Sequence, residues 1–95
     1  MERKDAYSKK VQAQLDEWDA EIDKLKARAR LAEADAQLEI QKQLETLGRK
    51  RKEAGDKLAE LRTASDDAWE EIKEGLESAK DSLGNALKSA GAKFR

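Results

Sequence analysis

The feature that most constrains the fold is a heptad pattern of apolar residues in the first half of the chain. Apolar side chains recur there at alternating steps of four and three residues, which places them on one stripe of an α-helix at the a and d positions of a coiled coil. The stripe comprises Val11, Leu15, Trp18, Ile22, Leu25, Ala29, Ala32 and Ala36. It continues through Ile40, Leu44, Leu47, Ala54, Leu58 and Leu61. A disordered chain has no reason to keep this period, so we expect one helix over about residues 3–62.

Composition supports an all-α chain. The 95 residues include no proline, and strong helix formers (Ala, Leu, Glu, Lys, Gln and Arg) dominate. Charged residues make up 43% and the hydrophobic class 38%, which leaves too little bulky apolar volume for a layered globule. We therefore expect residues 1–95 to form a single elongated coiled-coil unit.

The one convincing break lies after residue 62. Thr63, Ser65, Asp66 and Asp67 are all good N-cap types, and acidic residues follow them. This pattern predicts a turn at about 63–66 and a second helix over about 67–93. The apolar stripe of the second helix comprises Trp69, Ile72, Leu76, Ala79, Leu83, Leu87, Ala90 and Phe94.

Two glycines leave an alternative open. Gly48 and Gly55 each cost roughly 1 kcal/mol inside a helix, and a break at 48–55 would give a hairpin with two nearly equal arms. The residues between them contain no capping residue and no polar turn cluster, which favours a helix that runs through.

Charged residues fall in blocks of alternating sign. Residues 11–23 carry five acids and no base, residues 24–57 ten bases and six acids, and residues 58–81 three bases and eight acids. If the second helix folds back on the first, its acids face the basic run Arg49–Lys52. The residues expected to pack this helical hairpin are Leu44, Leu47, Leu58, Leu61, Trp69, Ile72, Leu76, Leu83 and Leu87.

The second helix is too short to cover the beginning of the first, so the stripe predicts a partner chain. An antiparallel homodimer centred near residue 35 sets the acidic block 11–23 of one copy against the basic region 49–57 of the other. Parallel pairing aligns like charges. The expected oligomer interface comprises Val11, Leu15, Trp18, Ile22, Leu25, Ala29, Ala32, Ala36 and Ile40.

No residue pattern predicts chemistry. The chain has no cysteine and no histidine, and it carries no glycine-rich phosphate loop and no nucleophile elbow. We expect no enzymatic activity, no catalytic residue, no metal site and no cofactor. The net charge is −1, and no aromatic residue lies in the basic run to stack on bases, so we expect no nucleic-acid partner.

The favoured function is therefore a non-enzymatic structural or protein-interaction role, through self-association or an unknown protein partner. The alternative is a peripheral membrane or lipid-binding protective role for the amphipathic C-terminal helix, whose stripe can lie in a lipid interface. The chain shows neither a signal peptide nor a membrane span, which predicts a cytoplasmic location.

Two segments carry a resemblance to a known family. The segments "KKVQAQLDEWDAEIDKLKARARLAEADAQLEIQKQLETL" and "LAELRTASDDAWEEIKEGLESAKDSL" resemble small coiled-coil proteins of proteobacteria and cyanobacteria that are described as apolipoprotein-like. The resemblance implies a long helix, a break and an amphipathic helix, with no catalytic residue. It also implies an association with stress responses.

Overall fold

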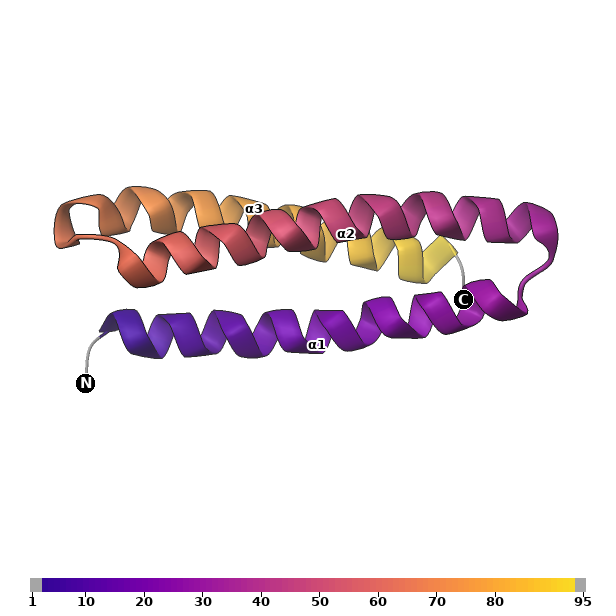
Figure 1. The fold of residues 1–95 in the computed structure, drawn as a ribbon, viewed down its shortest axis with the longest axis horizontal. Helices are drawn as coiled ribbons and strands as arrows, with labels where there is room; N and C mark the ends of the chain where they lie inside the picture. The colour runs from indigo at the N-terminus through magenta and orange to yellow at the C-terminus, as the bar shows by residue number, and fades with distance from the viewer. Residues whose placement is uncertain (1–2, 94–95) are drawn as a thin grey trace.

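The computed structural model describes residues 3–93, and these form three antiparallel helices. They are α1 (Arg3–Leu31), α2 (Ala34–Thr63) and α3 (Asp66–Lys93). Each helix runs antiparallel to the one before it, along the long axis of an elongated bundle of 50 × 20 × 18 Å (Figure 1). Within 3–93 only Ala32, Glu33, Ala64 and Ser65 lie outside a helix, so this part of the chain is all-α. Phe94, the last member of the predicted second stripe, lies outside the described residues.

The predicted helix over about 3–62 is wrong, because the chain turns back at Ala32 and Glu33. Residue 33 has φ −69° and ψ 160°, and its side chain makes no capping hydrogen bond. The turn therefore has no local cause of the usual kind. Its cause is tertiary: folding α2 back covers the apolar stripe of α1, which a straight helix in a single chain leaves in water.

The second turn follows the predicted chemistry. It occupies Ala64 and Ser65, within the predicted 63–66, and α3 begins at Asp66. The Ser65 hydroxyl accepts a hydrogen bond from the backbone N–H of Ala68 at 3.3 Å. Asp66 and Asp67 lie in the first turn of α3, where negative charge suits the helix dipole.

The alternative break at 48–55 is also wrong, because Gly48 and Gly55 both lie inside α2. Leu47, Ala54 and Leu58, which flank these glycines, are at most 2% exposed. Burying a leucine side chain stabilises a fold by about 1.5–3 kcal/mol, which outweighs the cost of a helical glycine.

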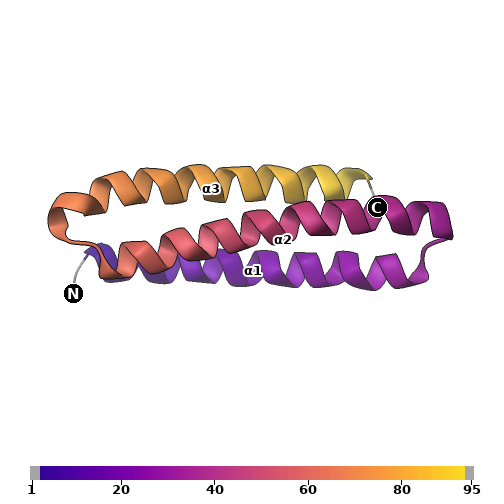
Figure 2. The same ribbon diagram turned by 45° about the horizontal axis from the view of Figure 1, so that its top comes forward.

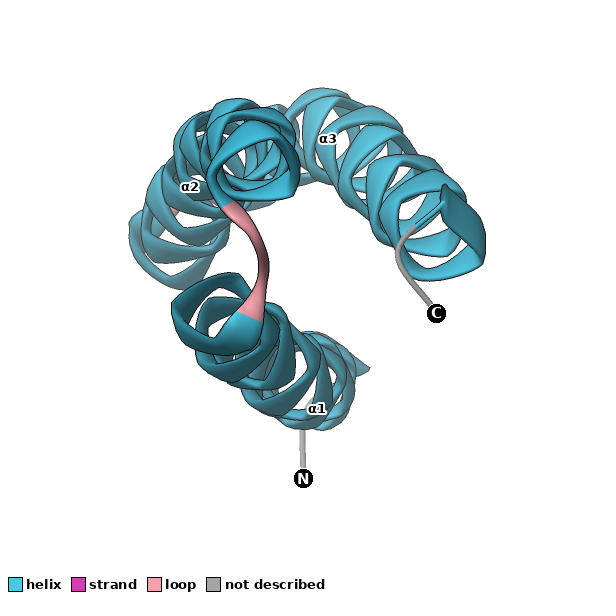
Figure 3. Ribbon diagram, turned by 90° about the vertical axis from the view of Figure 1, so that its right-hand side faces the viewer, coloured by secondary structure: helices cyan, strands magenta, loops and turns pink. Residues whose placement is uncertain are grey.

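The core runs the length of the bundle, and α2 is its central element. Contacts of α2 with α1 and with α3 are extensive, whereas α1 and α3 touch less (Figures 2 and 3). The largest fully buried side chains are Val11, Leu15, Leu47, Leu61, Leu76 and Leu83. Near the α1–α2 turn, Leu31 and Leu38 are exposed. The stripes of the predicted hairpin and the predicted dimer interface thus share one intramolecular core.

Replacement of Gly48 by alanine is expected to stabilise the protein. A Cβ atom at this position meets nothing within 4 Å, so the change adds helix propensity without a clash, worth about 0.5–1 kcal/mol. Urea unfolding followed by far-ultraviolet circular dichroism measures the gain in the free energy of unfolding.

Gly55→Ala is the matched comparison within the same helix. A Cβ atom there would lie 2.7 Å from Nη1 of Arg51, whose guanidinium pairs with Asp19 of α1. The Arg51 side chain must move, so this variant should gain clearly less than Gly48→Ala. Equal gains would contradict the expected cost of displacing the Arg51 side chain.

Candidate functional site

The side of the bundle opposite α2 contains a groove between α1 and α3. These two helices run parallel to each other, and the end-on view shows α2 joined closely to both while α1 and α3 face each other across the remaining side (Figure 3). The groove has a volume of about 460 Å³. Its lining consists of Glu17, Trp18, Glu21, Lys24, Leu25 and Arg28 from α1 and Gly84, Leu87, Lys88 and Gly91 from α3.

The floor of the groove is apolar and shaped by two glycines. Trp18 is half-buried, and its indole packs so closely on Gly84 that a Cβ atom there would lie 3.1 Å from the ring. Gly91 lies one heptad further along α3, and a Cβ atom there would meet nothing within 4 Å. Leu25 and Leu87 complete the floor. The missing side chain at Gly84 therefore makes room for the indole, and the missing side chain at Gly91 leaves space beyond it.

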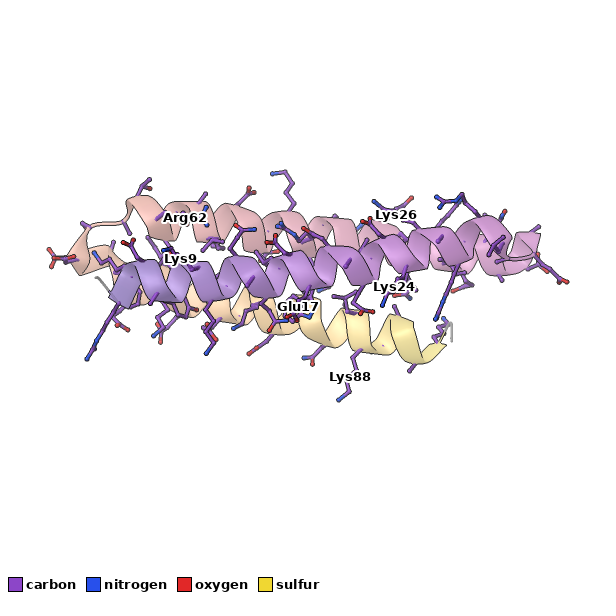
Figure 4. The ribbon with its side chains drawn as sticks, turned by 90° about the horizontal axis from the view of Figure 1, so that it is seen from below. Lys9, Glu17, Lys24, Lys26, Arg62 and Lys88 are labelled. Atoms are coloured by element: carbon purple, nitrogen blue, oxygen red, sulfur yellow. The ribbon has the colours of Figure 1, made fainter. Side chains whose placement is uncertain are left out.

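The rim of the groove is charged, and its sign changes along the bundle. Glu17 and Glu21 lie toward the N-terminal ends of α1 and α3, whereas Lys24, Arg28 and Lys88 lie toward the C-terminal ends. Figure 4 shows Glu17 and Lys24 on the side of α1 that faces α3, and Lys88 on α3. Glu21 and Lys24 meet at 3.6 Å where the sign changes.

The neighbouring sequence extends this polarity. Residues 24–31 and 82–93 carry bases and no acid, and residues 11–23 carry acids and no base. Exposed charges of one sign at each end create a field that orients a charged partner along the groove.

An aromatic cluster closes the space between α1 and α3 at their N-terminal ends. The rings of Tyr7 and Trp69 meet edge to face with centroids 5.8 Å apart, and the Lys73 ammonium lies 5.0 Å from the Tyr7 ring centroid. The Tyr7 hydroxyl donates a hydrogen bond to Glu77. The groove is therefore limited to the part of the α1–α3 side beyond this cluster.

A surface ion pair joins the same two ends. The Lys4 ammonium donates to the Asp66 carboxylate, and this hydrogen bond, together with the Lys4 charge, lowers the pKa of Asp66. A lowered pKa in the folded state means that the stabilisation is present at neutral pH and is lost on acidification below the ordinary carboxyl pKa. Because the Asp66 side chain is 92% exposed, solvent screens the pair and its contribution to stability is small.

The basic run at residues 49–52 is engaged within the protein. Arg51 donates from Nε and Nη2 to the two carboxylate oxygens of Asp19, at 2.7 and 3.2 Å. Lys50 donates to the Ser82 hydroxyl at 2.6 Å. The sequence predicts that this run faces acids of the second helix and of another copy. The structure instead pairs Arg51 with α1 of the same chain.

Most residues assigned to a dimer interface lie in the core of the single chain. Val11, Leu15, Ile22, Leu25, Ala29 and Ile40 are at most 7% exposed. Trp18 lines the groove, Ala32 lies in the turn, and Ala36 is exposed. A second copy is thus not needed to cover this stripe, because the turn at residues 32–33 lets α2 and α3 do so.

The residues assigned to hairpin packing lie in that same core. Leu47, Leu58, Leu61, Leu76, Leu83 and Leu87 are at most 9% exposed, and Leu44, Trp69 and Ile72 are partly buried against them. Of these, only Leu87 reaches the groove.

Within residues 3–93, no group of three or more acidic side chains is placed to hold a metal ion. The three described helices contain no stretch apolar enough to cross a lipid bilayer. What the site offers physically is a surface for binding by shape, apolar contact and charge.

Comparison with known proteins gives no family assignment. No family model, no curated protein and no solved structure matches the chain. The resemblance to apolipoprotein-like coiled-coil proteins therefore stays a prediction.

Gly84, Gly91 and the groove they help to form were not predicted from the sequence. A seven-residue spacing on one face of the second helix was the available feature, since two residues seven apart lie on the same side of a helix. This spacing indicates a groove only once the position of Trp18 against α3 is known, and that position depends on the unpredicted turn at Ala32 and Glu33.

Alanine at each groove glycine tests this geometry. Gly91→Ala should stabilise the protein by about 0.5–1 kcal/mol, because a methyl group there meets open space. Gly84→Ala should gain less and should change Trp18 fluorescence, because the methyl group presses on the indole. Chemical unfolding and emission spectra in a Trp69→Phe background measure both effects, and an unchanged spectrum in Gly84→Ala would contradict the contact.

Proposed function

We propose that the protein is a non-enzymatic helical interaction protein whose groove between α1 and α3 accepts an amphipathic helix of a partner. The observation that carries the proposal is a groove whose apolar floor combines the half-buried Trp18 indole with the buried side chains of Leu25 and Leu87, beside a glycine at which a Cβ atom would meet nothing within 4 Å. Apolar floors with polar rims are typical of helix-in-groove recognition.

The dimensions suit a short helix. The lining of α1 extends from Glu17 to Arg28, which corresponds to about 16 Å, or three helical turns, at 1.5 Å per residue. Two parallel helices beside a third leave the position that a fourth helix occupies in a four-helix bundle. A three-turn helix with apolar residues at steps of three and four fits this position.

The charged rim defines the orientation of the partner. A helix that runs antiparallel to α1 and α3 begins beside Lys24, Arg28 and Lys88 and ends beside Glu17 and Glu21. The matching partner has acidic residues in its first half and basic residues in its second half. The same order suits the helix dipole, so such a helix is itself stabilised.

Self-association remains a second mode of interaction in this proposal. The predicted antiparallel homodimer needs a basis other than an uncovered stripe on α1, because α2 and α3 of the same chain cover that stripe.

The lipid-binding alternative requires a rearrangement. The apolar stripe of α3, including Leu76 and Leu83 at 0% exposure, faces the protein core. The stripe can contact a lipid surface only if α3 separates from α2. A helical partner can bind in the groove without any such change in the bundle. The stress association and the cytoplasmic location rest on sequence alone and stay predictions.

A designed peptide tests the groove. We expect a peptide that forms a helix of three turns, with leucine at the a and d positions, glutamates in its first half and lysines in its second, to bind with a micromolar dissociation constant. In a Trp69→Phe background, Trp18 is the single tryptophan, and its emission should shift to shorter wavelength as the peptide excludes water from the groove. A peptide of the same composition with a scrambled apolar stripe should not bind.

Two glycine variants form the matched control. A Cβ atom meets nothing within 4 Å at either Gly91 or Gly48, but only Gly91 lies in the groove. Gly91→Leu should weaken peptide binding by about tenfold or more, and Gly48→Leu should leave it unchanged. Equal binding by both variants would refute the groove as the docking site. A Trp18 shift with anionic vesicles but not with the peptide would favour the lipid alternative.

A further inference from the structure

We propose that two copies of this chain exchange α1 to form an antiparallel dimer, in which the α1–α2 turn straightens and α1 and α2 become one helix. In the dimer, α1 of each copy packs on α2 and α3 of the other. The proposal does not depend on the groove, because the exchange rebuilds the same groove between chains. Exchange of α1 explains how the predicted homodimer can form while the core contacts of the single chain are kept.

The two turns of the bundle differ in chemistry. At the α2–α3 turn, the Ser65 hydroxyl caps α3 by accepting from the Ala68 N–H at 3.3 Å. At the α1–α2 turn, Glu33 occupies the N-cap position of α2 without a side-chain capping hydrogen bond. The described residues include no positive φ angle, so no left-handed residue holds this turn either. Packing of α1 on α2 is what keeps the chain bent there.

The sequence around the α1–α2 turn favours a continuous helix. Residues 24–45 contain no glycine, proline, serine, threonine or asparagine. At Glu33, φ is −69°, which is already helical, and only ψ, at 160°, departs from helical values. Rotation of the backbone at the turn restores about four backbone hydrogen bonds that the break removes.

The side-chain contacts between α1 and α2 are nearly symmetric about residue 35. Asp19 lies 16 residues before residue 35 and its partner Arg51 lies 16 residues after it. Gln12 and Arg62, which also join α1 to α2, lie 23 residues before and 27 after it. Two straight helices that cross antiparallel near residue 35 therefore reproduce these contacts between copies.

The third helix does not oppose the exchange. It packs mainly on α2, to which its capped turn holds it, and touches α1 less. It follows that α2 and α3 of each copy stay together while α1 moves to the other copy. Exchange of identical elements at a short hinge preserves native contacts, so the balance between the forms is set by concentration and by the turn.

Charge reversal at one symmetric pair is the decisive experiment. Asp19→Arg and Arg51→Asp each place like charges between α1 and α2 of their own chain. In an exchanged dimer of one variant with the other, both pairs become attractive. After the two variants are unfolded together and refolded at high concentration, native mass spectrometry should show heterodimers about fivefold or more above random pairing. Random pairing, or only monomers at every concentration, would overturn the proposal.

A capping substitution provides a second test with a stable protein. Glu33→Ser supplies the missing cap and should favour the bent form by about fivefold per chain, lowering the dimer association constant by roughly 25-fold. Glu53→Ser makes the same change at an exposed position inside α2 and should leave the association constant unchanged. Sedimentation equilibrium measures both constants, and a dimer that responds equally to the two substitutions would contradict exchange through the turn.

Discussion

Burial of the α1 stripe by α2 is the interaction on which the rest of the structure depends. The side chains of Val11 and Leu15 are at most 1% exposed because α2 turns back at residue 33 and lies along α1. An isolated helix of about 60 residues with an uncovered apolar stripe is not stable in water. The free energy of burial therefore overrides a local sequence that favours continuous helix, and it defines the bundle length, the register and the position of Trp18.

The balance between local preference and packing explains what sequence could predict. The all-α class, the apolar stripes and the turn before Asp66 follow from periodicity and capping residues, which act over a few positions. The turn at Ala32 and Glu33 has neither glycine nor capping chemistry, and it arises from contacts between residues far apart in sequence. Local patterns do not contain that information, so the number of helices could not be derived from them.

The same limit applies to the groove. Its charged residues were visible as blocks, but their placement on one rim depends on α1 and α3 running parallel, which requires two turns rather than one. The basic run at residues 49–52 shows the same limit for charge pairing. Opposite charges were expected to choose the alignment, and Arg51 does pair with Asp19, but within one chain. Charge complementarity described which segments attract each other without specifying whether they belong to one molecule or two.

The central position of α2 has a consequence for how this protein can change over evolutionary time. Helix α2 packs against α1 on one side and against α3 on the other, so a substitution at one of its core residues, such as Leu47 or Leu58, weakens a cluster that all three helices share. Residues of α1 and α3 pack chiefly against one neighbouring helix, α2. Divergence should therefore proceed unevenly, with the middle helix the slowest to vary and its two neighbours free to drift toward different partners.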